Sequence, residues 1–225
     1  MEHINGNITI YRDDCMSVLP TLQDNSVTLL LTDIPYDAVN MKSNGLRVLD
    51  KGKADSITFR LEPYITEINR IVKGSAYIFC EWEQISPLVN LFKRYGWSTR
   101  IIVWEKTNPS PMNGEYIWLS GVEFAVFAKK SGATFNAHCR NCVMRYPSGT
   151  SKDHPTEKPV SLFADIVNVS SDANDLVLDT CMGSGTTGVA CAKYNRKFIG
   201  IELDDHYYTI AKKRISDAQR QLNLF

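Results

Sequence analysis

The chain has 225 residues, of which 44% are hydrophobic and 22% charged, a composition typical of one globular domain with a buried core. Its 25 lysines and arginines balance its 25 aspartates and glutamates, which argues against a protein that coats nucleic acid through phosphate contacts. No apolar stretch approaches the roughly 20 residues that span a bilayer, no secretory signal opens the sequence, and six irregularly spaced cysteines fit reduced thiols in a cytoplasmic protein.

From the N-terminus to residue 128, apolar runs alternate with amphipathic segments. Apolar residues at helical spacing predict a helix over Glu62–Val72 that ends at Gly74, and a second helix over Pro87–Tyr95. The apolar runs predict strands at Ile8–Tyr11, Val27–Thr32, Ala76–Cys80, Thr99–Trp104 and Val122–Ala128. Three tryptophans beside these elements are expected in the core: Trp82, Trp97 and Trp104.

Residues 130–158 are polar and irregular, with no clear period. After them, helices and strands are predicted in alternation at Pro159–Asn168, Leu176–Asp179, Thr186–Tyr194, Lys197–Glu202 and His206–Gln219. Strands that alternate with helices imply a parallel-dominated α/β sheet with helices on both faces, here as one domain over residues 1–225. Such sheets bind ligands at the carboxyl ends of their strands.

A glycine-rich loop, Gly183-x-Gly185-x-x-Gly188, follows a predicted strand and opens a predicted helix, as in dinucleotide-binding folds. Glycine lets the main chain approach a ligand, and Glu202 at the end of the next strand can accept hydrogen bonds from ribose hydroxyls. A purely structural tight turn is the alternative. A nicotinamide enzyme is the first candidate, but only about 20 residues follow Glu202, too few to complete such a domain. Earlier strands must complete the sheet, in a permuted order.

Three separated motifs resemble those of the amino-group DNA methyltransferases. The tetrapeptide Asp33-Ile34-Pro35-Tyr36 resembles their Asp-Pro-Pro-Tyr motif, and residues 179–187 resemble their Asp-Pro-Phe-x-Gly-Ser-Gly-Thr-Thr loop. Residues 154–159, His-Pro-Thr-Glu-Lys-Pro, match a third signature. The catalytic loop precedes the cofactor loop, which is the order of the group called beta, and the resemblance covers nearly the whole chain.

The resemblance implies a Rossmann-like sheet with S-adenosylmethionine as cofactor and the exocyclic amine of a flipped adenine or cytosine as acceptor. Asp33 and the carbonyl of Ile34 would accept N–H bonds from the amine and favour a pyramidal nitrogen, Pro35 completes the loop, and Tyr36 would stack on the base. Glu202 would bind the ribose and Lys158 the methionine carboxylate. The full cofactor-binding set implied is Asp14, Lys158, Asp179, Cys181, Gly183, Gly185, Thr186 and Glu202.

Three residues depart from the family pattern. Ile34 replaces the first proline; its carbonyl remains, and a residue before proline still favours extended conformations. Thr180 and Cys181 replace a proline and a phenylalanine, which removes an aromatic contact to the cofactor. Each of two positions also has a structural alternative. Asp14 could simply cap a turn, and Lys158 could be a surface residue before a helix.

A zinc site is the other chemistry that the sequence suggests. His138-Cys139-x-x-Cys142, with His154 nearby, offers zinc ligands. A single Cys-x-x-Cys without a second matched pair is only half a site, so free thiols are favoured and no metal is expected.

Two candidate inserted loops, residues 37–60 and 131–153, carry positive charge. Their charge alone is typical of a solvated surface, but the chain has no room for a separate recognition domain, so we expect both to contact DNA. Residues 108–113, before Trp118, resemble a segment that can contact DNA in the same family; a packed surface loop is the equal alternative. A homodimer also stays open. The basic residues of the two loops are Lys42, Arg47, Lys51, Lys53, Arg60, Arg140, Arg145 and Lys152.

These features together predict a site-specific DNA methyltransferase, of the kind found in restriction-modification systems. Aspartate at the head of the tetrapeptide favours adenine N6 over cytosine N4, since serine is commoner there in the cytosine enzymes. The alternatives are cytosine N4 methylation, a catalytically weak DNA-binding relative, an RNA or protein amide acceptor, and a nicotinamide oxidoreductase, which gives no reason for the tetrapeptide.

Alanine at four basic loop positions, Lys51, Lys53, Arg140 and Arg145, should weaken DNA binding. For every phosphate that the variant no longer neutralises, the slope of log affinity against log salt should become shallower by about 0.9. Fluorescence anisotropy with a labelled duplex over a salt series measures both quantities, and an unchanged affinity and slope would contradict the assignment.

Overall fold

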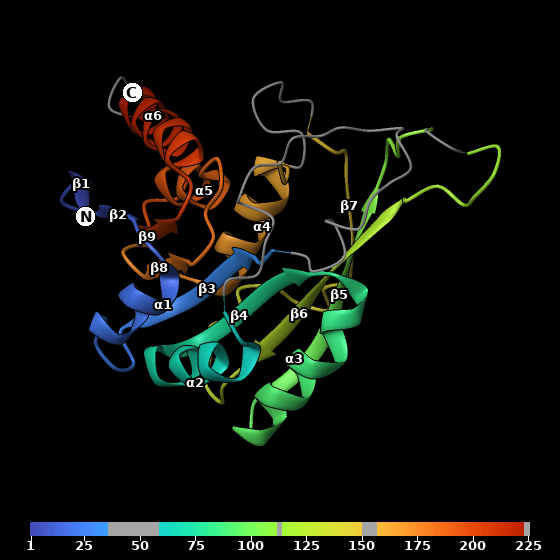
Figure 1. The fold of residues 1–225 in the computed structure, drawn as a ribbon, viewed down its shortest axis with the longest axis horizontal. Helices are drawn as coiled ribbons and strands as arrows, with labels where there is room; N and C mark the ends of the chain where they lie inside the picture. Colours follow the sequence, from blue (N-terminus) through green and yellow to red (C-terminus); the bar gives the residue numbers. More distant parts are fainter. Residues whose placement is uncertain (36–58, 112–113, 150–156, 223–225) are drawn as a thin grey trace.

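The computed structural model describes residues 1–35, 59–111, 114–149 and 157–222, and its centre is a single mixed sheet (Figure 1). The strands are β1 (Glu2–Asn5), β2 (Ile8–Arg12), β3 (Val27–Asp33), β4 (Val72–Cys80), β5 (Ser98–Lys106), β6 (Val122–Lys129), β7 (Val143–Tyr146), β8 (Leu176–Asp179) and β9 (Lys197–Glu202). The helices are α1 (Cys15–Val18), α2 (Leu61–Ile71), α3 (Trp82–Arg94), α4 (Val160–Ser170), α5 (Thr186–Lys193) and α6 (Asp205–Leu222), with a short 3-10 turn at Leu19–Thr21.

The strand order is β1-β2-β9-β8-β3-β4-β6-β5-β7. Pairing is parallel from β2 through β9, β8 and β3 to β4, and again between β5 and β7, whereas β6 is antiparallel to both its neighbours and β1 to β2. The predicted parallel-dominated α/β sheet is therefore confirmed, with an antiparallel β6. The order is also permuted as predicted, since β8, late in the chain, pairs with β3.

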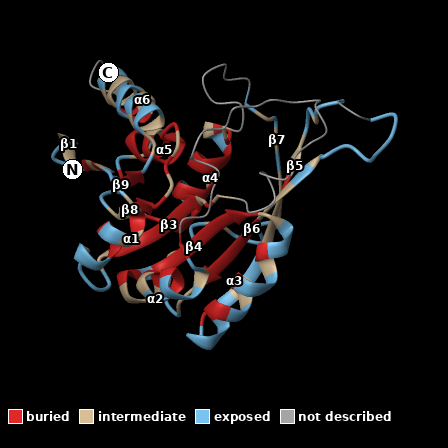
Figure 2. Cartoon of the chain, in the orientation of Figure 1, coloured by how far each residue is buried: buried red, intermediate tan, exposed pale blue. Residues whose placement is uncertain are grey.

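Helices cover both faces of the sheet, and two apolar cores result. Leu30 of β3 points into the core beneath α2 and α3, while its neighbours Leu29 and Leu31 point into the core beneath α4, α5 and α6. Because a strand buried on both faces has no polar side, β3 reads as one continuous apolar run. Figure 2 shows the central strands as the most deeply buried part of the fold.

The predicted end of the first helix is wrong, because α2 stops at Ile71 and the chain continues directly into β4. Gly74 thus lies within a strand, at a shift in register where Val27 pairs with Val72 but Leu29 pairs with Ser75. A Cβ at Gly74 would lie 2.2 Å from the carbonyl oxygen of Thr28. Glycine is required there because the neighbouring main chain comes close at the bulge, rather than because a helix ends.

The second helix begins five residues earlier than predicted, at Trp82. A capping box explains the start: Glu81 accepts from the main chain of Gln84, and the Gln84 side chain accepts from the main chain of Glu81. Pro87 lies inside the helix, where its missing N–H removes one main-chain bond. At the exposed first turn, the Trp82 side chain is 65% exposed, so its predicted place in the core is also wrong.

The prediction for the other two tryptophans is confirmed, whereas the prediction of a fully irregular segment is wrong. Trp97 and Trp104 are buried, as predicted. Residues 143–146 form the edge strand β7, parallel to β5, although the whole segment 130–158 was expected to be irregular. β1 and α1 were not predicted either, both being only four residues long. Across the described residues, no helix is long and apolar enough to cross a membrane.

Replacement of Gly74 by alanine should destabilise the protein by about 1–3 kcal/mol, because the added methyl group has to displace the main chain of Thr28. Chemical denaturation measures the free energy of unfolding. Gly6→Ala is the matched control, since a Cβ at Gly6 meets no atom within 4 Å. Equal stabilities of the two variants would show that the bulge does not need glycine.

Candidate active site

Three acidic residues end three adjacent parallel strands at one edge of the sheet. Asp33 ends β3, Asp179 ends β8 and Glu202 ends β9. The three strands run in the same direction, so their carboxyl ends meet, as predicted. The glycine loop starts directly after Asp179, and this edge is therefore where both sequence motifs come together (Figure 1).

The main chain of the predicted catalytic loop is held at two points. The Ile34 N–H donates to the carbonyl oxygen of Phe79 at 3.1 Å, and the Pro35 carbonyl accepts from Gln84 Nε2 at 3.2 Å. The Ile34 side chain is buried in the core beneath α2 and α3. These anchors supply rigidity that a first proline provides in the family motif. Tyr36, the fourth residue of the catalytic set, lies outside the described residues.

Lys158 lies against the carboxylate of Asp33, the predicted catalytic acid. Its ammonium is 2.5 Å from Asp33 Oδ2 and 3.1 Å from Glu123 Oε2, and its side chain is only 6% exposed, which excludes a surface lysine. Glu123 also contacts Lys106 Nζ at 2.8 Å. Burial alone would raise the pKa of Glu123, but the charges and hydrogen bonds of Lys158 and Lys106 outweigh it and hold the pKa below its ordinary value. The edge thus carries a row of alternating charges.

The glycine loop is shaped by helix packing and by Glu202. Gly185 precedes α5 with φ of 84°, and a Cβ there would lie 2.9 Å from that of Ala211 on α6. Glu202 Oε2 accepts from the Gly183 N–H and Oε1 from the Asp204 N–H, both at 2.8 Å. Burial nevertheless raises the pKa of Glu202. A carboxylate oxygen has lone pairs beyond these bonds, so Glu202 can still accept hydrogen bonds from ribose hydroxyls.

Asp179 is buried beneath this loop. Its carboxylate accepts from Thr187 Oγ1 at 2.5 Å and from the Cys181 N–H at 3.1 Å. Burial is the main reason that the pKa of Asp179 rises to about 7, and these hydrogen bonds only partly oppose it. Thr186, at the start of α5, donates to the carbonyl of Lys158 at 3.4 Å, which links the loop to the third motif.

The departure at Thr180 is compensated within the fold. Its hydroxyl is 2.8 Å from the hydroxyl of Tyr64 and 3.1 Å from that of Thr32, and all three groups are buried. A buried hydroxyl costs free energy unless it is hydrogen-bonded, and here both bonds are present. Cys181 packs against the adjacent core.

Asp14 caps α1, which was the structural alternative at this position. Its side chain accepts from the Met16 N–H at 2.7 Å. The preceding residue, Asp13, donates its N–H to the Glu202 carbonyl, so the cap lies beside the end of β9. The predicted contact of Asp14 with the cofactor or the base stays a prediction.

Sequence reasoning missed several residues that organise this edge. Arg214 of α6 pairs with Glu157 and donates to Ser184 in the glycine loop. It therefore joins the third motif to the second. Glu123 was missed too, although an acid at the start of an antiparallel strand is a usable signal: such a start lies at the same edge as the carboxyl ends of the parallel strands.

The described arginines of the second basic loop are already paired. Arg140 forms an ion pair with Asp165 on α4, and Arg145 with Glu105 on β5 at 3.0 Å. Most of the other predicted DNA contacts, Lys42, Arg47, Lys51, Lys53 and Lys152, lie outside the described residues. Of the first loop's basic residues, Arg60 is described and exposed.

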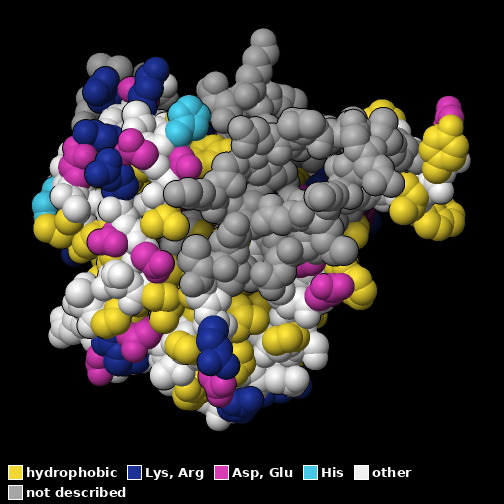
Figure 3. All heavy atoms as spheres, in the orientation of Figure 1, with side chains coloured by type: hydrophobic (Ala, Val, Ile, Leu, Met, Phe, Trp, Pro, Cys, Tyr) yellow, Lys and Arg dark blue, Asp and Glu magenta, His cyan; other side chains and the backbone are white. Residues whose placement is uncertain are grey.

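The segment between β5 and β6 is an exposed arm rather than a packed surface loop. Trp118 is 95% exposed, and large apolar side chains beside it are exposed as well: Tyr116, Ile117 and Leu119. Hydrophobic side chains form the projecting end of the arm in Figure 3. The arm leaves the sheet at Lys106 and returns at Val122, next to the site.

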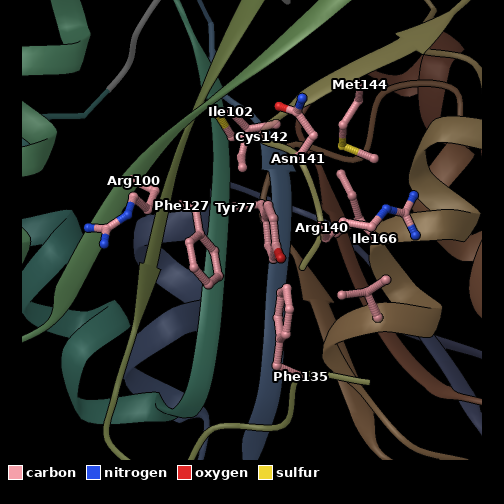
Figure 4. Close-up of a pocket in the computed structure, with 11 residues that line it drawn as sticks. Tyr77, Arg100, Ile102, Phe127, Phe135, Arg140, Asn141, Cys142, Met144 and Ile166 are labelled. Carbon is pink, nitrogen blue, oxygen red and sulfur yellow. The ribbon is translucent and has the colours of Figure 1, made fainter. Parts of the chain in front are cut away.

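A separate cavity of about 400 Å³ lies on the face of the sheet, between β4, β5, β6 and α4 (Figure 4). Tyr77, Phe127 and Ile166 are among its mostly apolar walls. Its two arginines are engaged, Arg140 with Asp165 and Arg100 with the Thr99 carbonyl. No residue of the predicted catalytic or cofactor sets lines it, so this cavity is distinct from the site at the strand ends.

Of the zinc ligands considered from the sequence, His138, Cys139 and Cys142 lie in the described part of the chain. Cys139 and Cys142 are exposed free thiols. Within the described residues, no three His, Cys, Asp or Glu side chains are grouped as for a metal ion. His154 lies outside that part of the chain.

The chain is similar to known DNA methylases. The family described as DNA methylase, N6_N4_Mtase, matches residues 27–213. Type II methyltransferase M2.MboI of Moraxella bovis is 28% identical over 95% of this chain and 89% of its own length, and putative methylase YubD of Escherichia coli K12 is 29% identical over 93% and 90%.

Solved structures of methyltransferases are also similar to this chain. The M1.HpyAVI complex with SAM is 31% identical, covers 92% of this chain and 98% of its own, and has a TM-score of 0.73. PvuII DNA methyltransferase, cytosine-N4-specific, is 16% identical with a TM-score of 0.73 over 97% and 93%, and so shares the fold.

The raised pKa of Asp179 should make stability fall as pH rises. Below the unfolded value of 3.8, both states hold the proton; between 3.8 and about 7, only the folded state does, so folding loses up to about 4 kcal/mol across this window. Asp179→Asn, which keeps an acceptor for the Cys181 N–H, should remove that loss. Urea unfolding of both proteins at pH 4.5, 6 and 8 tests this, and parallel pH dependences would refute it.

Proposed function

We propose, from the premise that this chain belongs to the DNA methylase family of N6-adenine and N4-cytosine methyltransferases, that it methylates the N6 amine of adenine in DNA. The observation that carries the proposal is the position of Asp33. Asp33 ends β3 at the same edge as the glycine loop, and the next residue, Ile34, is anchored through its N–H. Two acceptors at an edge where a cofactor can bind suit an amine with two N–H groups.

S-adenosylmethionine is the cofactor, and it supplies an electrophilic methyl group on a sulfonium sulfur. The residues present fit it. Glu202 offers carboxylate oxygens for ribose hydroxyls. The N–H of Gly183 ties the loop to Glu202, and Gly185 lets the loop pack against α6. We place Asp179, Cys181 and Thr186 along the methionine end. Asp14 and Lys158 complete the proposed binding set.

The target amine is a weak nucleophile because its nitrogen lone pair is delocalised into the base. Asp33 and the Ile34 carbonyl would each accept one N–H bond, which favours a pyramidal nitrogen with its lone pair aimed at the methyl group. That stabilisation increases towards the transition state, where positive charge grows on the nitrogen. Pro35 fixes the carbonyl direction, and Tyr36 would stack on the base. This chemistry needs neither a covalent intermediate nor a metal.

The acceptor base must leave the duplex, at a cost of a few kcal/mol for unpairing and unstacking. We assign DNA contacts to residues 37–60 and 131–153 and to the exposed arm between β5 and β6. The pairing of Arg140 and Arg145 with acidic residues means that they would have to exchange partners to reach phosphate. A homodimer would enlarge the DNA footprint of a chain with zero net charge.

Adenine is proposed because the tetrapeptide starts with aspartate, the residue that the adenine enzymes of this family favour. The fold itself does not choose the base, since the cytosine-N4-specific PvuII enzyme shares it. Cytosine N4 is therefore the direct alternative.

The test is transfer of labelled methyl from S-adenosylmethionine to unmethylated genomic DNA, followed by nucleoside digestion and mass spectrometry. We expect N6-methyladenine from the wild type and at least a roughly 100-fold lower rate from Asp33→Ala, because the variant lacks an acceptor that is used in the transition state. Asp24→Ala, at an exposed ion pair with Arg70, is the matched control and should keep full activity.

The other outcomes are equally definite. N4-methylcytosine would overturn the choice of base but keep the mechanism. Cofactor binding by calorimetry without any methylated nucleoside would identify a binding protein or another acceptor. Full activity of Asp33→Ala would remove Asp33 from the mechanism.

A further inference from the structure

We infer that Glu123 is a positioning residue: it shares the charge of Lys158 with Asp33 and so keeps the Asp33 carboxylate directed at the target amine. The inference rests on the proposed role of Asp33. It concerns residues of β5 and β6 that none of the three sequence motifs includes.

The geometry is a row of four charges of alternating sign. Lys106 Nζ lies 2.8 Å from Glu123 Oε1, Lys158 Nζ lies 3.1 Å from Glu123 Oε2, and Lys158 Nζ lies 2.5 Å from Asp33 Oδ2. The four charges sum to zero. Each member comes from a different segment, β5, β6, the stretch before α4, and β3, so the fold assembles the row.

Burial makes the balance matter. An ammonium as deeply buried as that of Lys158 is costly unless opposite charge compensates it. Glu123 is itself only 25% exposed, and apart from its ion pair with Lys158, its Oε2 has no hydrogen-bond partner among the described residues. If Glu123 were neutral, Lys158 would lose one of its two described carboxylate partners, and the other, Asp33, would be drawn more strongly towards the lysine and away from the amine.

Among the described residues, four further groups lie near the row, and their effects differ from that of Glu123. The ring of Phe79 lies 5.8 Å from Lys158 Nζ and favours its charged form. Glu81 and Cys80 at the end of β4 and Asp179 at the end of β8 interact electrostatically with members of the row, and burial raises the pKa of all three. Glu123 differs from these groups, because the two neighbouring lysines hold its pKa below the ordinary value and keep it ionised.

The decisive variant is Glu123→Gln, which keeps the size of the side chain and removes its charge. We expect kcat to fall about 10- to 100-fold. The alkaline limb of the kcat–pH profile should move to lower pH, because Lys158 loses a neighbouring negative charge and gives up its proton more readily. Glu123→Asp should restore that limb.

Two further variants complete the test: one should shift the pH profile in the opposite direction, and the other is a control. Lys106→Gln removes a positive charge from the row, so the alkaline limb should move to higher pH, opposite to Glu123→Gln. Glu62→Gln removes the acid of an exposed ion pair with Arg94 on α3 and should change neither kcat nor the profile. Thermal unfolding checks that all variants are folded.

A readout without substrate separates this inference from the proposed function. Titration of the Lys158 side chain by NMR in lysine-labelled protein, assigned with Lys158→Arg, needs neither DNA nor cofactor. We expect its midpoint to fall in Glu123→Gln and to rise in Lys106→Gln. An unchanged midpoint, or a fall in kcat with an unchanged pH profile, would overturn the inference. Methylation of cytosine instead of adenine would overturn the proposed base and leave this result intact.

Discussion

Parallel pairing of β3 with β8 and of β8 with β9 is the constraint on which the site depends. Asp33 and the glycine loop are separated by about 150 positions in the chain, yet their strands are neighbours, so their carboxyl ends meet at one edge. Short loops after these strands then suffice to place the carboxylates of Asp33 and Glu202 and the glycine loop at one edge. The position of the site depends on strand order in the sheet more than on motif order along the chain. A chain with permuted motifs can therefore build the same site as a chain with the motifs in the other order.

The antiparallel strand β6 adds a second contribution to that edge. Because β6 runs against its neighbours, its first residues, rather than its last, lie beside the ends of β3 and β4. Glu123 reaches Lys158 for this reason, and Lys106 reaches Glu123 because β5 pairs with β6. The hairpin thereby supplies two charges to the site, while its apolar arm extends from the same place.

Hydrogen bonds in the two motif loops explain how the chain tolerates its departures from the family motifs. Thr180 takes the place of a proline, and its hydroxyl is satisfied by Tyr64 and Thr32. Ile34 takes the place of another proline, and the bonds from its N–H to Phe79 and from Gln84 to the next carbonyl hold the loop. In both cases a side-chain or main-chain hydrogen bond replaces the rigidity that proline would provide.

The sequence by itself determined the strand ends that carry Asp33, Asp179 and Glu202, the helix after the glycine loop, and the family to which these motifs belong. These features are local: apolar runs, glycines and acids within a few residues of one another. Where local signals were ambiguous, predictions failed. Gly74 resembled a helix end although it serves a bulge, and Pro87 resembled a helix start although a capping box had already begun α3.

Only the tertiary structure decided which distant side chains meet. Lys158 was assigned to the cofactor from its motif, but its nearest described partners are Asp33, 125 positions away, and Glu123. Arg214 joins Glu157 and Ser184 across two motifs, with no pattern around it that distinguishes it from other arginines of an amphipathic helix. Ion pairs of this kind depend on strand order, strand direction and the depth of burial. None of these is encoded in the spacing of residues along the chain, because each arises only when the sheet is assembled.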